Sequence, residues 1–222
     1  MVENIARPTR EELNNISSQI NVPVGTLSMD TECLRINNEY CLAEISFYDV
    51  VSNKNVFSTY INPGIEFHVQ EYKKYYGFDD DVIKNSPKLI DIEEVIKRLL
   101  STNILIGWNI KEDLKYFPHL KAYAYAVRDC MTRYSNKYGA WNPGFGNNDF
   151  VSLEQASKNC GFKLAPGEKY HTARVDAKAC AHVWQFCEDQ DLPKPSIPNE
   201  LVKKSDLAEV LKPNVDLHPL PF

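Results

Sequence analysis

The stretch VGTLSMDTECL, residues 24–34, decides the fold expected of this chain. Its apolar residues predict a short buried strand, with Asp30 and Glu32 at the carboxyl end of that strand. Side chains two residues apart on a strand point to the same face, so both carboxylates face one side of the sheet. Two carboxylates placed in this way can share a metal ion. The stretch therefore predicts a metal site as well as a strand.

Further strands and a helix follow in the sequence. Residues 40–51 (YCLAEISFYDVV) and 56–64 (VFSTYINPG) predict two strands, which the turn SNKN joins as a hairpin. Residues 91–100 predict a helix whose apolar residues recur every three or four positions, and residues 103–108 (NILIGW) and 122–129 (AYAYAVRD) predict two more strands. Alternating strands and helices are typical of an α/β domain with a partly parallel sheet, in which sites lie beyond the carboxyl ends of strands.

Two later stretches add the remaining candidates for the site. Asp113 lies in GWNIKEDL, where a short helix is expected to stop near Pro118, and His171 and Asp176 lie in HTARVDA, at the entrance to the last predicted helix. Four gathered carboxylates raise each other's pKa unless a cation neutralises them, and hard oxygen ligands favour Mg2+ or Mn2+. Two such ions about 3.5–4 Å apart clamp the attacking and leaving oxygens of a phosphodiester. A neutral imidazole can take the proton from the attacking water, so the set predicts a two-metal nuclease site.

Composition limits the class of protein. The chain has 222 residues, of which 43% are hydrophobic, which suits one substantial core and a single domain with appendages. Its six cysteines include no CxxC pair, no apolar run reaches about 18 residues, and the N-terminal residues lack the apolar core of a signal peptide. We therefore expect an intracellular protein of the cytoplasm or nucleus that is neither secreted nor inserted in a membrane. A net charge of −5 disfavours a protein that coats nucleic acid, but not an enzyme that grips a strand end.

The predicted α/β domain spans residues 23–189 and has an appendage on each side. Residues 1–22 predict a helical extension, with Thr9 as N-cap and Glu12 completing a capping box. Residues 190–222 predict a Pro-rich tail, a composition that suits an extended segment bound by a protein partner.

Three segments complete the predicted domain. Residues 131–148 are rich in Gly, Asn and aromatic residues and predict an irregular loop. Residues 153–162 predict a helix with Gly161 as its C′ residue, and residues 175–187 predict the last core helix. Aromatic and basic side chains of the loop suit base stacking and core packing equally well. These side chains are Tyr134, Lys137, Tyr138, Trp141 and Phe145.

Three motifs resemble those of the DEDDh 3′-to-5′ exonucleases, the DnaQ-like family with a ribonuclease-H-like fold. MDTECL resembles the family's Asp-x-Glu motif on the first strand, GWNIKEDL its motif with Asn followed four residues later by Asp, and HTARVDA its His-x-Ala-x-x-Asp-Ala motif. The likeness runs from residue 24 to 188. It implies a three-layer α/β fold with a mixed sheet flanked by helices. It also implies removal of nucleotides from the 3′ end of single-stranded DNA or RNA as nucleoside 5′-monophosphates.

The resemblance also implies roles for individual residues. Asp30, Glu32 and Asp176 would hold one Mg2+ or Mn2+ ion, Asp30 and Asp113 would hold a second, and His171 would act as the general base on water. Asn109 would shape the start of the second motif. The candidate substrate contacts are Thr31, Cys33, Leu34, Asn109 and Trp141.

Two departures from the family pattern bear on how a substrate fits. Cys33-Leu34 replaces the Thr-Thr-Gly common after the glutamate, and Glu112 stands where an aromatic residue usually precedes the second motif's aspartate. The choice between DNA and RNA depends on how the pocket treats a 2′-hydroxyl, and it stays open. The alternative function is a catalytically silent nuclease-like module that recruits a partner through its C-terminal tail. That alternative predicts the loss of a metal ligand or of the histidine, and all five are present.

Overall fold

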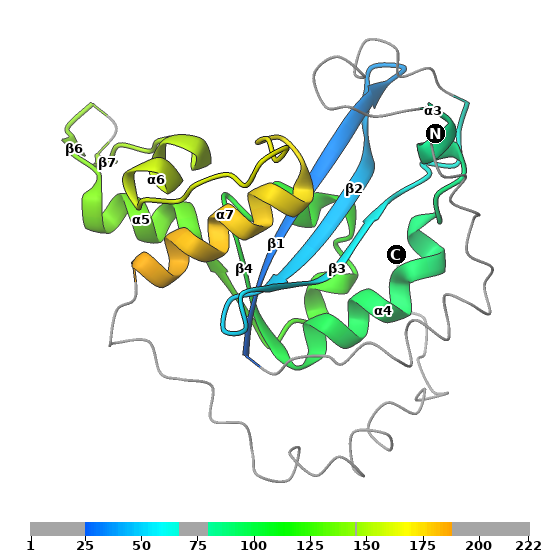
Figure 1. The fold of residues 1–222 in the computed structure, drawn as a ribbon, viewed down its shortest axis with the longest axis horizontal. Helices are drawn as coiled ribbons and strands as arrows, with labels where there is room; N and C mark the ends of the chain where they lie inside the picture. Colours follow the sequence, from blue (N-terminus) through cyan, green and yellow to red (C-terminus); the bar gives the residue numbers. More distant parts are fainter. Residues whose placement is uncertain (1–24, 67–79, 145, 188–222) are drawn as a thin grey trace, which may run out of the picture. The chain divides into compact units, whose positions relative to one another are not determined.

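A five-stranded mixed sheet lies at the centre of the part of the chain that the computed structural model describes, residues 25–66, 80–144 and 146–187 (Figure 1). Its strands are β1 (Gly25–Ile36), β2 (Glu39–Asp49), β3 (Lys54–Tyr60), β4 (Asn103–Gly107) and β5 (Ala126–Asp129). Their order across the sheet is β3-β2-β1-β4-β5. β2 runs antiparallel to β1 and β3, whereas β4 and β5 run parallel to β1. The predicted mixed sheet is therefore confirmed.

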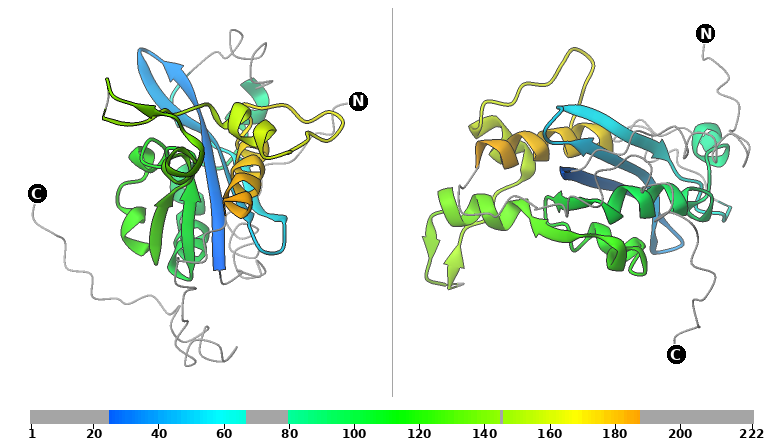
Figure 2. Two further views of the ribbon diagram at one scale, coloured as in Figure 1. Left: turned by 90° about the vertical axis from the view of Figure 1, so that its left-hand side faces the viewer. Right: turned by 90° about the horizontal axis from the view of Figure 1, so that it is seen from below.

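Helices flank the sheet on both sides. In chain order they are α3 (Asp80–Lys84), α4 (Leu89–Ser101), the short 3-10 helices η1 (Asp113–Tyr116) and η2 (Leu120–Tyr123), α5 (Cys130–Tyr138), α6 (Leu153–Asn159) and α7 (Ala173–Phe186). The right-hand view of Figure 2 shows α7 on one side of the strands and α4 on the other. The predicted three-layer α/β fold is thus confirmed. Within the described segments, no helix has the length and apolar character needed to cross a bilayer.

The two faces of β1 serve different layers. Leu27 and Met29 are fully buried in a hydrophobic cluster with α4, so this face of the strand belongs to the core. Asp30 and Glu32 lie on the opposite face, because successive side chains of a strand alternate. The predicted apolar face of α4 is confirmed by the burial of all its members, Ile92, Val95, Ile96, Leu99 and Leu100. Alternation thus separates a hydrophobic side of β1 from an acidic one.

β1 is longer than the sequence predicts, and this changes where its carboxylates lie. Asp30 and Glu32 fall in the middle of the strand rather than at its end, because β1 stays paired with β2 as far as Ile36. The parallel pairing with β4, however, stops at Ser28. The acidic residues therefore begin where β4 leaves the edge of β1, and the site still lies beyond the carboxyl end of a parallel strand.

The prediction of an irregular loop over residues 131–148 is wrong. The first part of this segment belongs to α5, which Asp129 caps by accepting a hydrogen bond from the backbone N–H of Thr132 at 2.7 Å. The rest contains a small hairpin of β6 (Trp141–Asn142) and β7 (Asn147–Asn148). Asn and Gly residues in the segment resemble loop sequence, but the capping aspartate immediately before it allows a helix to start.

The aromatic side chains of this segment differ in burial. Tyr134 is buried in the hydrophobic cluster under α7, so it serves packing. Tyr138 and Trp141 are 46% and 65% exposed. Phe145 lies outside the described residues.

The C-terminal part of the domain follows the prediction closely. α6 has Cys160 as its C-cap, and Gly161 follows with a positive φ of 80°, which a C′ glycine adopts without steric strain. The last helix begins at Ala173, two residues earlier than predicted. The predicted N-terminal helix over 1–22 and the predicted tail over 190–222 lie outside the described residues, so both stay predictions.

Candidate metal centre

An acidic cluster forms between β1 and the start of α7. The side chains of Glu32, His171 and Asp176 each offer a ligand atom, and these atoms lie within 4.8 Å of one another. Asp30 is close to the same group, because the charges on Asp113, Asp176 and Glu32 add to the effect of burial in raising its pKa. The fold thus brings together all five of the residues that the sequence singles out, from three separate segments.

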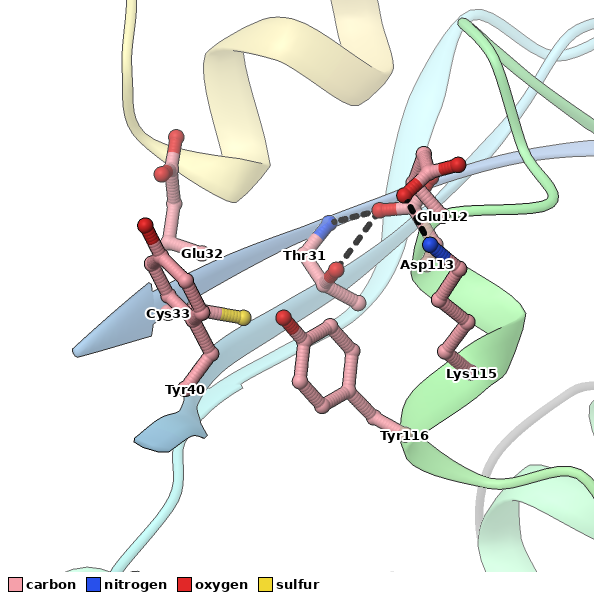
Figure 3. A pocket seen from close by; sticks show the side chains of 8 residues that line it. All are labelled: Thr31, Glu32, Cys33, Tyr40, Glu112, Asp113, Lys115 and Tyr116. Atoms are coloured by element: carbon pink, nitrogen blue, oxygen red, sulfur yellow. Dashed lines mark hydrogen bonds and ion pairs between the residues drawn. The ribbon is translucent and has the colours of Figure 1, made fainter. Parts of the chain in front are cut away.

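Asp113 reaches the cluster through the open edge of β1. Beyond Ser28 this edge has no partner in β4, so its backbone groups need other partners. Asp113 Oδ1 accepts hydrogen bonds from the backbone N–H of Thr31 at 3.0 Å and from the Thr31 hydroxyl at 2.6 Å (Figure 3). Asp113 Oδ1 therefore takes the place of a strand partner at this edge of β1.

The loop between β4 and η1 is shaped by two residues. Asn109 adopts a positive φ of 60°, and its carbonyl accepts a hydrogen bond from the backbone N–H of Glu112 at 2.9 Å. Asp129 accepts a hydrogen bond from the backbone N–H of Ile110 at 3.0 Å. Asn109 thus turns the chain, while the capping aspartate of α5 holds the loop that leads to Asp113. Asp129 is not among the residues predicted for the site, although an acidic residue between a strand and a helix is a known cap signal.

His171 and Asp176 form a closed loop at the entrance to α7. His171 is exposed and has a positive φ of 64°, and its backbone N–H donates to Asp176 Oδ2 at 3.1 Å. The other oxygen, Asp176 Oδ1, is buried and accepts no hydrogen bond from the described residues. A buried carboxylate oxygen without a donor is costly unless a cation or another donor meets it. Its position beside Glu32 fits a bound divalent ion.

The carboxylates of the cluster have strongly perturbed acidities. Burial, followed by the charges of nearby carboxylates, raises the pKa of Glu32 from 4.5 to about 8. Burial also raises the pKa of Asp113 and of Asp176 to about 6, although each accepts hydrogen bonds that oppose the shift. The pKa of Asp30 is raised well above its usual range by burial and by the other three carboxylates. Without a cation the cluster therefore keeps protons at neutral pH, and a hard divalent ion would displace them.

Glu44 is a buried residue that the sequence analysis missed. It lies on β2 directly opposite Glu32, and its carboxylate Oε2 accepts a hydrogen bond from the backbone N–H of Ala173 at 3.1 Å. The available signal was a glutamate inside the apolar strand YCLAEISF, because a buried acid needs a partner.

A cavity of about 630 Å³ adjoins the acidic cluster (Figure 3). It is lined by Thr31, Glu32, Cys33, Tyr40, Glu112, Asp113, Lys115 and Tyr116. Figure 3 shows the Cys33 sulfur directed toward the Tyr116 hydroxyl. Burial raises the pKa of Cys33 to about 12, so the thiol stays protonated and is a poor nucleophile. Cys33 therefore brings no reactive thiolate to this cavity.

Two of the candidate substrate contacts lie away from this cavity. Leu34 is fully buried in a cluster with Ile36 and Ile83, so its side chain does not reach a ligand in the cavity. Trp141 lies on the β6–β7 hairpin, which Figure 1 shows beyond α5 and away from β1. Among the candidates, Thr31 and Cys33 line the cavity, and Asn109 acts on the loop beside it.

Comparisons with known proteins agree with this fold. No protein-family profile matches the chain, and no curated protein matches it at a significant level. A structure of Exonuclease X in complex with 5′-overhanging duplex DNA matches with a TM-score of 0.54 and 17% identity, over 73% of this chain and 90% of that one. A full-length 3′-exonuclease matches with a TM-score of 0.53 and 14% identity, over 71% and 78% of the two chains. The catalytic unit of Neurospora crassa Pan2, with its protease and nuclease domains, matches with a TM-score of 0.53 and 13% identity, over 86% of this chain and 29% of that one. At these identities the likeness concerns the fold, and the chain has the fold of these exonucleases.

Proposed function

We propose that this chain is a metal-dependent 3′-to-5′ exonuclease that hydrolyses the terminal phosphodiester of single-stranded DNA or RNA and releases nucleoside 5′-monophosphates. The observation that carries the proposal is the convergence of Glu32, His171 and Asp176 within 4.8 Å, next to Asp30 and Asp113. Buried carboxylates that repel one another lower the stability of a fold. A cluster of this kind is therefore better explained by function than by structure.

In this proposal Asp30, Glu32 and Asp176 hold one Mg2+ or Mn2+ ion, and Asp30 and Asp113 hold a second. Bound divalent ions would neutralise charge on the phosphodiester and lower the pKa of bound water. The buried Asp176 Oδ1, which has no hydrogen-bond donor among the described residues, supports a cation at this point. The oxygen-rich ligand set supports Mg2+ or Mn2+ over softer metals.

His171 is the proposed general base. Its imidazole lies at the exposed side of the cluster, with a ring nitrogen within 4.8 Å of the ligand atoms of Glu32 and Asp176. A neutral imidazole at this position would accept a proton from the water that attacks the terminal phosphodiester. The hydrogen bond from its backbone N–H to Asp176 holds the residue at the cluster.

The cavity beside the cluster is the proposed place of the terminal nucleotide. Its volume of about 630 Å³ is in the range of small-molecule sites, about 300–1,000 Å³. Tyr40 and Tyr116 offer aromatic faces for an unpaired base. Lys115, which forms an ion pair with Glu112, also lines the cavity. The fold shared with an exonuclease solved on duplex DNA supports nucleic acid as the substrate class.

Digestion of paired 5′-labelled DNA and RNA oligonucleotides with Mn2+ tests the proposal, with the Asp30→Ala protein as control. A ladder that shortens from the 3′ end, and that the Asp30→Ala protein does not produce, is the expected result. The same assay shows which sugar the enzyme prefers. Absence of cleavage with either oligonucleotide would favour the catalytically silent module, for which the tail over residues 190–222 would be the partner-binding segment.

A further inference from the structure

Glu44 makes contacts that the proposed chemistry does not use. Its side chain comes from β2, is only 6% exposed, and lies on the face of the sheet that α7 covers. Its carboxylate accepts hydrogen bonds from the backbone N–H groups of Ala173, at 3.1 Å, and of Arg174. Ala173 is 129 residues away in the sequence. Glu44 therefore joins the middle of the sheet to the first turn of the last helix.

These hydrogen bonds replace a missing helix cap. The first N–H groups of any α-helix have no acceptor within the helix. A Thr at the N-cap position usually supplies one, but the Thr172 side chain makes no capping hydrogen bond in α7. Glu44 serves the groups of Ala173 and Arg174 instead, and its negative charge suits the positive end of the helix dipole.

The turn that Glu44 holds is the one that carries the metal centre. His171 lies two residues before Ala173, and Asp176 lies three residues after it. The His171 N–H to Asp176 Oδ2 hydrogen bond closes these six residues into one unit, in which His171 keeps its positive φ of 64°. Glu44, on β2, binds the two backbone N–H groups in the middle of this segment, those of Ala173 and Arg174.

The strand partner of Glu44 is Glu32, the ligand on the other side of the cluster. Directly opposite carboxylates on antiparallel strands repel each other. A neutral apolar residue at position 44 would avoid this repulsion, but it would leave the backbone N–H groups of Ala173 and Arg174 without this acceptor. We propose that Glu44 is a positioning residue that fixes His171 and Asp176 opposite Glu32 by holding the first turn of α7. The inference rests on the function proposed above.

Misplaced ligands bind Mn2+ more weakly, so the Mn2+ affinity tests this positioning. Electron paramagnetic resonance of free Mn2+ gives the affinity without a nuclease assay. We expect Glu44→Ala to weaken Mn2+ binding by about 10- to 100-fold, the range found when groups that orient metal ligands are removed. Glu44→Gln keeps a carbonyl acceptor for the helix and is expected to recover most of the affinity. Glu39→Ala, at the exposed end of the same strand, is the matched control and should bind Mn2+ as the unaltered protein does.

Circular dichroism of each variant gives the folded fraction, to which the affinities are normalised. If Glu44→Ala does not fold, Glu44→Asp takes its place, because it withdraws the acceptor by one methylene while keeping the charge. Unchanged Mn2+ affinity in the folded Ala or Asp variant would overturn the inference, and so would a Gln variant as weak as the Ala variant. If the unaltered protein binds Mn2+ but cleaves no oligonucleotide, the proposed function fails while the role of Glu44 is still measured.

Discussion

Thr31 donates two hydrogen bonds to a single oxygen of Asp113, one from its backbone N–H at 3.0 Å and one from its hydroxyl at 2.6 Å. This contact ties η1 to the edge of β1 at the point where β4 has turned away. It also opposes the effect of burial, which raises the pKa of Asp113 to about 6. Without this contact the pKa of Asp113 would therefore be higher.

Replacing Thr31 by Val tests the value of the hydroxyl. The substitution keeps the shape of the side chain but removes one donor, and a hydrogen bond to a charged group contributes about 1.5–3 kcal/mol. We expect Thr31→Val to raise the pKa of Asp113 further and to shift the acidic limb of the activity profile to higher pH. Activity measured from pH 5.5 to 8 checks this. Thr31→Ser keeps the donor and is the control, and identical limbs for the Val and Ser variants would contradict the role.

Asp30→Asn tests whether the Asp30 carboxylate serves metal binding while destabilising the metal-free protein. Burial and the charges on Asp113, Asp176 and Glu32 raise the pKa of Asp30, so the carboxylate is under strain when no metal is bound. We expect the Asn variant to lose exonuclease activity and the stabilisation by Mn2+, while its metal-free form melts at the same or a higher temperature. Thermal denaturation with EDTA and with Mn2+ measures both effects. A variant that Mn2+ still stabilises fully would remove Asp30 from the ligand set.

The metal-free protein is expected to lose stability as the pH rises. The pKa of Glu32 is about 8 in the fold and 4.5 in a solvated chain, so between these values the folded state binds the proton that the unfolded state releases. Its contribution to stability is therefore highest below pH 4.5 and is lost as the pH rises to about 8. Melting temperatures in EDTA across this range check the sign, with Glu32→Gln as control. A flat difference between the two proteins across the range would contradict it.

Local patterns predicted the parts of this fold that depend on periodicity. The alternation in β1 and the 3–4 spacing in α4 follow from residues close together in the sequence, and both gave correct buried faces. The contacts that complete the site join distant residues. Thr31 and Asp113 are 82 apart, and Glu44 and Ala173 are 129 apart. No local pattern shows which backbone N–H groups the sheet leaves without an acceptor.

Leu34 is a predicted substrate contact that tertiary packing removes from the site. Alternation places it on the face of β1 that carries Asp30 and Glu32, and its position just after the first motif suggested a contact with substrate. In the structure Ile83 of α3 packs in the same cluster, so Leu34 is fully buried. The five-residue helix α3 is too short to give a clear periodic signal, and its packing position is set by the tertiary fold.

His171→Ala tests the proposed general base. Loss of a positioned base lowers rates by about 10²- to 10⁴-fold. Hydroxide in solution partly substitutes for the missing base as the pH rises. We therefore expect a large fall in kcat at pH 7 that shrinks toward pH 9. His119→Ala is the matched control, since its imidazole is also exposed but lies near Glu93 on α4. Unchanged activity of the His171 variant at neutral pH would exclude it from the mechanism.

Tyr40→Ala tests whether the cavity binds the terminal base. Tyr40 is 65% exposed on the return strand of the β1–β2 hairpin and lines the cavity beside the acidic cluster. Stacking of one base on an aromatic ring contributes about 1–3 kcal/mol, which corresponds to a rise in KM of about 5- to 150-fold. We expect that rise with little change in kcat or Mn2+ affinity, and Tyr40→Phe should retain a low KM because it keeps the ring. Tyr125, 60% exposed at the opposite end of the parallel strands, supplies the control variant Tyr125→Ala. An equal KM for the two alanine variants would place the terminal base elsewhere, whereas a fall in kcat alone would mean that Tyr40 acts on the reaction rather than on binding.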